Sequence, residues 1–267
     1  MTYVHGYTDR ETRRLLEQSL ILEELLHSGT RYNEGSRVLE AGCGVGAQTL
    51  IIARRNPGIE LISMDISLAS VSKAESMVHQ AGYRNVTFLQ GDIYKSGFGH
   101  ASFDHIFVCF LLEHLSDPLG ALLIMKSLLR KGGTITVIEG DHGTGVWSPE
   151  TEASRLAWDG LIRSQLYLGH DPFIGRRLFP LLDSAGFRNI AVTPRPVYSD
   201  RSNPELLDGV VNRIITPMVL SAGERVMGQQ LLTRESWEKG LKDISSVAST
   251  GEGSFFYTWF KGCGIRL

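Results

Sequence analysis

The chain has 267 residues, of which 42% are hydrophobic and 21% are charged, enough apolar residues to fill one α/β domain with a modest cap. Its 27 basic and 29 acidic side chains nearly balance, which argues against a nucleic-acid partner because such proteins usually carry a basic surplus. Three scattered cysteines, Cys43, Cys109 and Cys263, do not make a disulfide framework or a CxxC metal site, so we expect no metal. The sequence contains no apolar signal core and no run of membrane-spanning length, so we expect a cytoplasmic protein without a membrane span.

The first half of the chain alternates between helical and strand patterns. A capping box over residues 8–11 opens a helix that is expected to reach about residue 27. Five short apolar strands are expected next, at residues 36–40, 59–65, 86–90, 103–108 and 134–139. Helices are expected between them, at residues 47–55, 69–80 and 118–129. This alternation predicts a parallel sheet with helices on both faces.

The second half of the chain has longer helical stretches and fewer predicted strands. The pattern predicts a helical segment, a helix, a strand, a long helical stretch and a last strand, at residues 148–169, 175–185, 189–192, 203–251 and 254–260. Structureless loops of such length are rare in compact domains. We therefore expect residues 141–172 and 203–251 to be helical insertions that cap the sheet.

A glycine-rich stretch over residues 38–47 is the most informative part of the sequence. A short apolar strand ends near Glu40, and Gly42, Gly44 and Gly46 follow at alternate positions before a predicted helix. Glycine is needed where the backbone turns tightly or approaches a ligand closely, and a helix that starts after such a loop aims its free N–H groups at an anion. The stretch predicts a nucleotide-type cofactor. Its Gly-x-Gly-x-x-Ala spacing, which ends at Ala47, also fits a relaxed dinucleotide fingerprint, so an NAD(P)-linked reductase is an alternative.

The loop and the motifs after it resemble the class I S-adenosylmethionine (SAM)-dependent methyltransferases, whose first motif reads acidic-x-Gly-x-Gly-x-Gly. The resemblance covers residues 36–140 and extends more loosely to the end. It rests on Glu40, on Asp92 after the third strand, on the segment 103–115 and on the Lys-Gly-Gly turn at 131–133, all in the family's order. It implies a doubly wound, Rossmann-like sheet of seven strands with a reversed last hairpin. It also implies SAM as cofactor and S-adenosylhomocysteine as product.

The resemblance assigns the adenosine contacts residue by residue. Asp65, which closes the second strand about twenty residues after the glycine loop, is expected to accept the ribose hydroxyls, and Ser67 suits the N-cap of the following helix. Ile66 would pack on adenine. Asp92 would accept the adenine amino group, and its neighbours Gly91 and Ile93 complete that turn.

The methionine end of the cofactor has a second set of expected contacts. Glu40 would accept from the amides of the glycine loop, and Gln48, at the start of the following helix, would bind the methionine carboxylate. Tyr3, which precedes the N-terminal helix, and Arg14, which lies on it, would fold over the methionine end; packing and a solvated charge are the alternatives for these residues. The last expected cofactor residues follow the fourth strand, at Cys109 and Phe110.

Methyl transfer from a sulfonium is an in-line displacement in which positioning supplies much of the acceleration, and a base is needed only for an acceptor that keeps its proton. The carboxyl ends of the fourth and fifth strands offer two candidate bases. His142 is expected in a flexible loop between glycines, and His114 follows Glu113; a structural role is the alternative for each.

The sequence also narrows the methyl acceptor. The segment Val108-Cys109-Phe110-Leu111 lacks the Asn/Asp-Pro-Pro motif of base-amino methyltransferases and the Pro-Cys nucleophile of cytosine C5 enzymes. The helical insertions are instead rich in large apolar side chains, namely Trp147, Trp158, Tyr167, Met218, Met227 and Trp237. We therefore expect a small-molecule acceptor of aromatic or apolar character, as in the quinone- and natural-product-type methyltransferases. The methylated atom, whether O, N, S or C, is left open.

Residues 1–267 are interpreted as a single methyltransferase domain. Residues 1–35 would form an N-terminal helix and lid, residues 36–140 the SAM-binding core, and the two insertions the cap. A SAM-binding scaffold without chemistry and an aminopropyl transferase of similar fold are further alternatives. The oligomeric state is open, a homodimer included.

Overall fold

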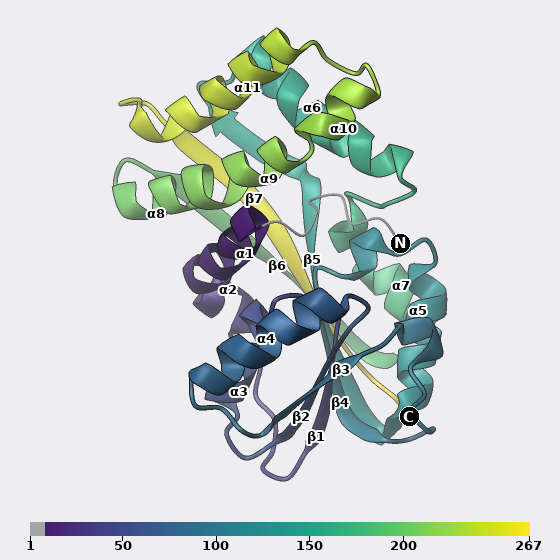
Figure 1. Cartoon of the computed structure of the whole chain (residues 1–267). Helices are drawn as coiled ribbons and strands as arrows, with labels where there is room; N and C mark the ends of the chain where they lie inside the picture. Colours follow the sequence, from purple (N-terminus) through teal and green to yellow (C-terminus); the bar gives the residue numbers. More distant parts are fainter. Residues whose placement is uncertain (1–8) are drawn as a thin grey trace. The chain divides into compact units, whose positions relative to one another are not determined.

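The computed structural model describes residues 9–267 (Figure 1). The chain forms two compact units. The sheet unit comprises Glu23–Gly140, Ile174–Arg195 and Trp259–Leu267. The described part of the helical unit comprises residues 9–22, Asp141–Phe173 and Pro196–Thr258. Three strands continue from one unit into the other, namely β5 (Leu129–Ser148), β6 (Arg188–Asp200) and β7 (Ser254–Ile265).

The seven strands lie in the order β3-β2-β1-β4-β5-β7-β6. The first four are β1 (Arg37–Ala41), β2 (Glu60–Asp65), β3 (Val86–Gln90) and β4 (Phe103–Cys109). The pairs among β1 to β5 are parallel. The Gly132 amide donates to the Arg266 carbonyl and the Arg266 amide to the Gly133 carbonyl, at 2.7 and 2.9 Å, so the start of β5 meets the end of β7 and the two strands are antiparallel. The doubly wound, Rossmann-like sheet with its reversed last hairpin is confirmed.

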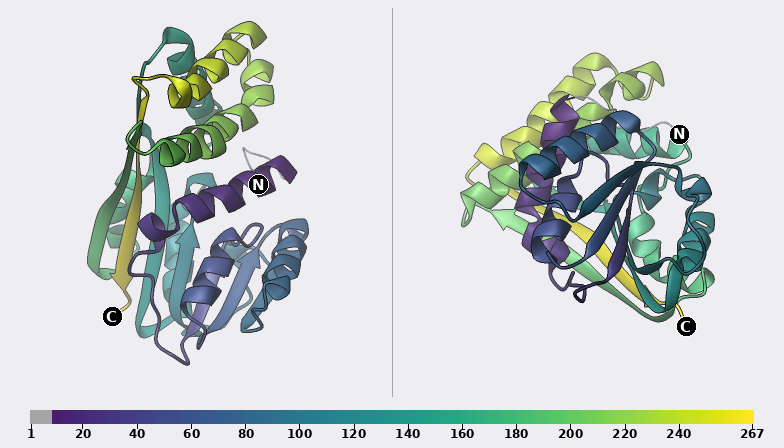
Figure 2. Two further views of the ribbon diagram at one scale, coloured as in Figure 1. Left: turned by 90° about the vertical axis from the view of Figure 1, so that its left-hand side faces the viewer. Right: turned by 60° about the horizontal axis from the view of Figure 1, so that its bottom comes forward.

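Helices cover both faces of the sheet unit (Figure 2). On one face lie α3 (Ala47–Arg55) and α4 (Leu68–Gln80), and on the other α5 (Pro118–Leu128) and α7 (Leu178–Ser184). The unit also contains α2 (Glu23–His27) and the 3-10 turns η1 (Ile93–Lys95), η2 (Leu112–His114) and η3 (Ile174–Arg177). Side chains alternate along each strand, so Leu39 and Ala41 of β1 join the core under α5 and α7, whereas Glu40 faces α3.

The helical unit takes its helices from three stretches of chain. They are α1 (Asp9–Ile21), α6 (Glu152–Tyr167), α8 (Pro204–Asp208), the π-helix η4 (Gly209–Ile215), α9 (Thr216–Ser221), α10 (Gly223–Gly228), α11 (Arg234–Ser246) and the turn η5 (Val247–Ser249). Within this unit α11 packs on α6, and α1 packs on η4. The single N-terminal helix expected from sequence is wrong, because the chain breaks at Leu22 into α1 and α2.

The last three strands are much longer than their sequence patterns predict. β5 was expected to end at residue 139, with glycines making a flexible loop after it, but it continues to Ser148. The reason is visible at Gly145, where a Cβ atom would lie 2.5 Å from the indole of Trp158. The glycine thus makes room for a large side chain that packs on the strand. Glycine in this segment is a packing device and not a strand breaker.

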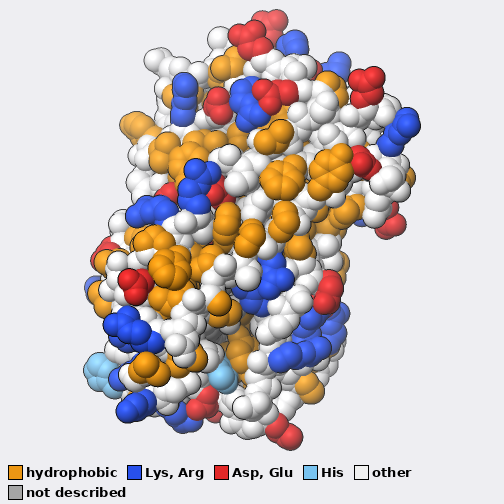
Figure 3. Space-filling model, turned by 180° about the vertical axis from the view of Figure 1, so that it is seen from behind, with side chains coloured by type: hydrophobic (Ala, Val, Ile, Leu, Met, Phe, Trp, Pro, Cys, Tyr) orange, Lys and Arg blue, Asp and Glu red, His pale blue; other side chains and the backbone are white. Residues whose placement is uncertain are grey.

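The surface agrees with the near-neutral charge of the sequence. On the face drawn in Figure 3, Lys and Arg side chains are interspersed with Asp and Glu. Across residues 9–267, no helix is both long enough and apolar enough to cross a membrane.

The third glycine of the loop should be required for stability. Gly46 has a φ of +86°, and a Cβ atom there would lie 2.9 Å from the Ala74 Cβ on α4. We expect Gly46→Ala to lower the free energy of unfolding by about 2–4 kcal/mol, through the left-handed backbone and the steric overlap together. Urea denaturation measures this, with Gly132→Ala as control. Gly132 has a φ of +82° but no atom within 4 Å of the added Cβ, so only the backbone cost of about 1–2 kcal/mol applies. Equal losses in both variants would contradict the packing argument.

Candidate functional site

The glycine loop connects β1 to α3 at the carboxyl edge of the sheet. Gly42, Gly44 and Gly46 all have positive φ values, of 79°, 52° and 86°. The amides of Gly42 and Cys43 both donate to the Met64 carbonyl, at 2.8 and 3.0 Å, which fastens the loop to the end of β2. A Cβ atom at Gly44 would have no atom within 4 Å, so this glycine borders open space. The loop therefore presents bare backbone at a place where a ligand can approach it closely.

Asp65 at the end of β2 lies directly against this loop. One carboxylate oxygen accepts from the Gly44 amide at 2.9 Å, and the other accepts from the Ser67 amide at 2.9 Å. Burial raises the pKa of Asp65, and the backbone hydrogen bonds oppose that shift. The Ser67 hydroxyl accepts from the Ser70 amide and caps α4, as the sequence predicts. Ile66, which was expected to pack on adenine, is an exposed apolar side chain next to Asp65.

Glu40 lies beneath the loop and is almost fully buried. Its Oε2 atom accepts from the hydroxyls of Thr49 on α3 and Ser63 on β2, at 2.6 and 2.7 Å. Burial raises the pKa of Glu40 to about 7, against the two hydrogen bonds, and the negative charge of Asp65 adds to the rise. The expectation that Glu40 accepts from the loop amides is wrong: strand alternation points it at α3, and Asp65 takes the Gly44 amide instead.

The turn after β3 has the geometry of a capped 3-10 turn. Asp92 accepts from the Tyr94 amide at 3.0 Å and so caps η1, while Ile93 is buried. A Cβ atom at Gly91 would lie 2.7 Å from the Met64 sulfur, so glycine is needed for this close approach. Asp92 thus has a structural function in addition to the adenine contact expected from sequence, which stays a prediction.

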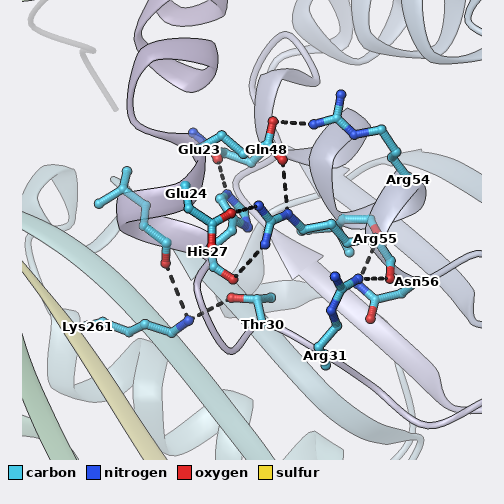
Figure 4. A network of polar contacts seen from close by, with 12 residues as sticks. Glu23, Glu24, His27, Thr30, Arg31, Gln48, Arg54, Arg55, Asn56 and Lys261 are labelled. Atoms are coloured by element: carbon cyan, nitrogen blue, oxygen red, sulfur yellow. Dashed lines mark hydrogen bonds and ion pairs between the residues drawn. The ribbon is translucent and has the colours of Figure 1, made fainter. Parts of the chain in front are cut away.

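Gln48, in the first turn of α3, is held by a residue that sequence reasoning missed. Its amide oxygen lies 2.6 Å from the Nε2 atom of His27 on α2 (Figure 4). His27 is fully buried, and burial lowers its pKa to about 4. Nothing in the local sequence signals this contact, because the two residues are 21 positions apart.

The loop after β4 is fixed by a second buried acid that sequence reasoning missed. Glu139, at the end of the apolar part of β5, accepts from the Leu111 and Leu112 amides at 3.0 and 2.7 Å through one oxygen. It is fully buried, and burial together with the charge of Glu113 raises its pKa well above the usual value. The preceding Phe110 has a φ of +56°, a costly backbone conformation for an aromatic residue. A carboxyl group at the end of an otherwise apolar strand was the available signal.

The other expected residues at the end of β4 are enclosed in the sheet unit. Cys109 is a buried thiol whose pKa burial raises well above its usual value. His114 lies in η2, with its Nε2 atom 3.4 Å from a carboxylate oxygen of Glu113, and both side chains are buried.

His142 lies on β5 in the helical unit and is buried, so the expectation of a flexible loop is wrong. Its Nδ1 atom is 2.7 Å from the Tyr257 hydroxyl, and its ring centroid is 5.7 Å from that of Trp158. Burial lowers its pKa to about 4, and the charge of Arg14 contributes. Among the residues that the structure describes, nothing bonds the buried Nε2 atom. Two fully buried side chains of α6, Ser164 and Gln165, also carry polar atoms that no described residue bonds: the Ser164 hydroxyl and both ends of the Gln165 amide. Sequence reasoning did not single them out.

Arg14, one of the N-terminal residues expected at the methionine end, belongs to the helical unit, whereas the glycine loop belongs to the sheet unit. Arg14 lies on α1 in the helical unit, where it donates to both carboxylate oxygens of Glu11, at 2.8 and 2.6 Å, and to the Gln18 amide oxygen at 2.6 Å. These bonds give Arg14 a buried, charged partner on its own helix. Tyr3 lies outside the described residues.

Comparisons with known proteins identify the family. The methyltransferase domain family matches residues 32–167. The chain is 30% identical to an uncharacterized methyltransferase of Schizosaccharomyces pombe over 83% of this chain and 84% of that protein. It is 28% identical to a demethylmenaquinone methyltransferase of Bacillus velezensis, over 40% of this chain and 46% of that one. It is also 28% identical to the 27-O-demethylrifamycin SV methyltransferase of Amycolatopsis mediterranei, over 50% of this chain and 49% of that enzyme. The alignments with these two enzymes thus span about half of each relative.

Solved structures share the fold. A phosphoethanolamine N-methyltransferase of Haemonchus contortus in complex with SAM matches all of this chain and 60% of its own, with a TM-score of 0.60 and 15% identity. A methyltransferase-like protein of Bacillus halodurans matches 92% of this chain and 98% of its own, with a TM-score of 0.57 and 16% identity. The chain belongs to the methyltransferase domain family. It is a SAM-dependent methyltransferase, and the alternatives of a nicotinamide cofactor and of a scaffold without chemistry are wrong.

The residues at the carboxyl edge fit this cofactor. Gly44 leaves its backbone open, Asp65 offers a half-buried carboxylate beside it, and Ile66 adds exposed apolar surface. SAM, when bound, supplies an electrophilic methyl group on a sulfonium. This chain's residues have to bind and orient it, and keep water from the reacting atoms.

Removing the Asp65 carboxylate should weaken cofactor binding. We expect Asp65→Ala to raise the dissociation constant of S-adenosylhomocysteine about tenfold or more, since a hydrogen bond to a charged group is worth about 1.5–3 kcal/mol. Calorimetry measures this. Asp104→Ala is a matched control, because Asp104 also accepts from a backbone amide, that of Arg37, but at the opposite end of the strands. An unchanged affinity in a folded Asp65→Ala protein would refute the ribose assignment.

Glu40 should make stability depend on pH. Its pKa rises from 4.5 to about 7 in the folded state, so its contribution is fully present below pH 4.5 and is lost as the pH rises through 7. We expect the free energy of unfolding of Glu40→Gln, relative to the parent, to increase by about 1–3 kcal/mol between pH 5 and pH 8. Urea denaturation at both pH values tests this. Glu60→Gln, which removes an exposed carboxylate of β2, controls for net charge. A difference between Glu40→Gln and parent that is constant with pH would count against a protonated Glu40.

Proposed function

We propose that this methyltransferase acts on a small molecule with an aromatic or apolar body, and that the acceptor binds in the helical unit around His142. The observation that carries the proposal is the buried His142 Nε2 atom, which has no partner among residues 9–267, inside a cluster of aromatic side chains. That cluster comprises Trp147, Trp158, Phe255 and Tyr257. Burying an unpaired polar atom costs about 1–3 kcal/mol, so a ligand that pairs with it gains affinity.

The proposed role of His142 is that of general base. A pKa of about 4 keeps the imidazole neutral near pH 7, the form that can take a proton. An unpaired buried N–H is rarer in proteins than an unpaired acceptor. We therefore assign the proton to Nδ1, which donates to the Tyr257 hydroxyl, and this leaves the Nε2 lone pair for the acceptor's proton. His114, beside Glu113, is the alternative base.

Two further observations support a small polar-aromatic acceptor. The relatives named above include enzymes that, by name, methylate demethylmenaquinone and 27-O-demethylrifamycin SV. In addition, Ser164 and Gln165 bury hydroxyl and amide groups that no described residue pairs, so an acceptor with hydroxyl or carbonyl groups fits better than a hydrocarbon. The proposed location is the cytoplasm, in keeping with three free cysteines.

His142 should affect turnover more than cofactor binding. With labelled SAM and a panel of phenols and hydroquinones, we expect His142→Gln to lower kcat about 100-fold or more and to leave the affinity for S-adenosylhomocysteine unchanged. His105→Gln, which alters a histidine on β4 bonded to Thr134, is the control. Equal turnover in His142→Gln and parent would demote His142 to a packing residue. Methyl transfer confined to proteins or peptides would refute the small-molecule class.

A further inference from the structure

Gln48 is a polar side chain whose two ends have different surroundings. It is half-buried in the first turn of α3, directly after the glycine loop. Its amide oxygen is bonded to His27, whereas no group in the described part of the chain accepts from its amide nitrogen. The N-terminal end of a helix carries a partial positive charge and favours anions. An unused N–H donor at this position therefore has the chemistry to bind a carboxylate.

The direction of the His27–Gln48 hydrogen bond follows from the surroundings of the imidazole. His27 is fully buried and stacks on Phe107 of β4, with ring centroids 5.4 Å apart. Its Nδ1 atom is buried and bonds no described residue, so the proton belongs on Nε2, where it has an acceptor. Burial and the nearby positive charges of Lys261 and Arg55 lower the pKa of His27 to about 4, which keeps the ring neutral. Nε2–H then donates to the Gln48 oxygen, and the Gln48 NH₂ group must point away from His27.

The helix that carries His27 is held at both of its ends (Figure 4). At its start, Arg55 of α3 donates to the carboxylates of Glu23 and Glu24, at 3.0 and 2.5 Å. At its end, the buried ammonium of Lys261 on β7 caps the helix. It donates to the carbonyls of Leu26 and Ser28 at 3.3 and 2.9 Å, and to the hydroxyl of Thr30 at 2.7 Å. These contacts fix the position of His27 relative to α3.

We propose that His27 is a positioning residue for the cofactor: it fixes the orientation of the Gln48 amide so that its N–H group donates to the carboxylate of the methionine end of SAM. That carboxylate is the only anionic group of the cofactor, and it is the group that the start of α3 attracts. The inference rests on SAM binding at the glycine loop and is independent of the acceptor proposed above. His27 does not touch the cofactor in this scheme and acts only through Gln48.

The test compares two ligands that differ only at the methionine end. S-adenosylhomocysteine carries the amino acid, and 5′-methylthioadenosine has the same nucleoside and thioether without it. We expect His27→Phe, which keeps the stack on Phe107 but removes the donor, to weaken binding of S-adenosylhomocysteine about tenfold and to leave 5′-methylthioadenosine unchanged. Gln48→Leu should do the same. The double variant should be no weaker than Gln48→Leu alone, because both changes remove one interaction.

Two further variants separate positioning from packing. His27→Gln places an N–H donor near the position of Nε2 and should recover part of the affinity for S-adenosylhomocysteine. His105→Phe, which changes another histidine stacked on an aromatic ring, that of Tyr32, should bind both ligands like the parent. Calorimetry gives the affinities, and thermal denaturation shows that each variant is folded.

Each contrary outcome has a distinct meaning. Equal losses for both ligands in His27→Phe would overturn the proposal, because His27 would then support only the packing of α2 on α3. Undiminished binding of S-adenosylhomocysteine to Gln48→Leu would overturn it by removing Gln48 from the cofactor contacts. If the parent bound neither ligand, the assignment of SAM to the glycine loop would itself be wrong.

Discussion

The hydrogen bond from the Gly44 amide to the Asp65 carboxylate is the contact on which the arrangement of the candidate cofactor site depends. It joins the loop after β1 to the end of β2, and the second oxygen of Asp65 extends the connection to the start of α4. This arrangement requires glycine at positions 44 and 46. Gly44 has a left-handed backbone at an open surface, and Gly46 has no side chain that would keep α4 away from the loop. Loop, strand end and helix are therefore positioned together.

Two buried acids support the same edge of the sheet in different ways. Glu40 accepts from the hydroxyls of Thr49 and Ser63, which can rotate when the charge of the carboxyl group changes. Glu139 accepts from the backbone amides of Leu111 and Leu112, which cannot rotate. The first arrangement tolerates a change of protonation near neutral pH. The second fixes the loop after β4, including the left-handed backbone next to it, and so sets the position of the residues that follow.

Sequence alone predicts the part of this enzyme that is determined by local pattern. The glycine loop, the alternation of strands and helices and the cap at Ser67 follow from spacing and from residues with narrow conformational roles, whereas the reversed last hairpin followed only from the family resemblance. The length of β5 does not, since the glycines at its end read as breakers until Trp158 is seen to pack over Gly145. The partners of Gln48 and of the β4 loop also escape prediction, because His27 and Glu139 are distant in sequence and carry no motif. Long-range polar contacts are specified by the packed fold and not by periodicity.

Lys261 is a long-range contact that is unfavourable for stability in its charged form. Lowering its pKa from 10.5 to about 8 corresponds to about 3 kcal/mol of unfavourable free energy for the charged form in the fold. Among residues 9–267, no carboxylate accepts from this ammonium, which donates to two carbonyls and one hydroxyl. A neutral amine would have only two protons for these three acceptors, so the charge is needed to complete the cap. The same charge disfavours protonation of His27 and so helps to keep the imidazole neutral, with its one proton on the Nε2 atom that faces Gln48. Lys261 thus lowers the stability of the fold, yet it holds the segment after α2 in place and keeps the neighbouring imidazole neutral.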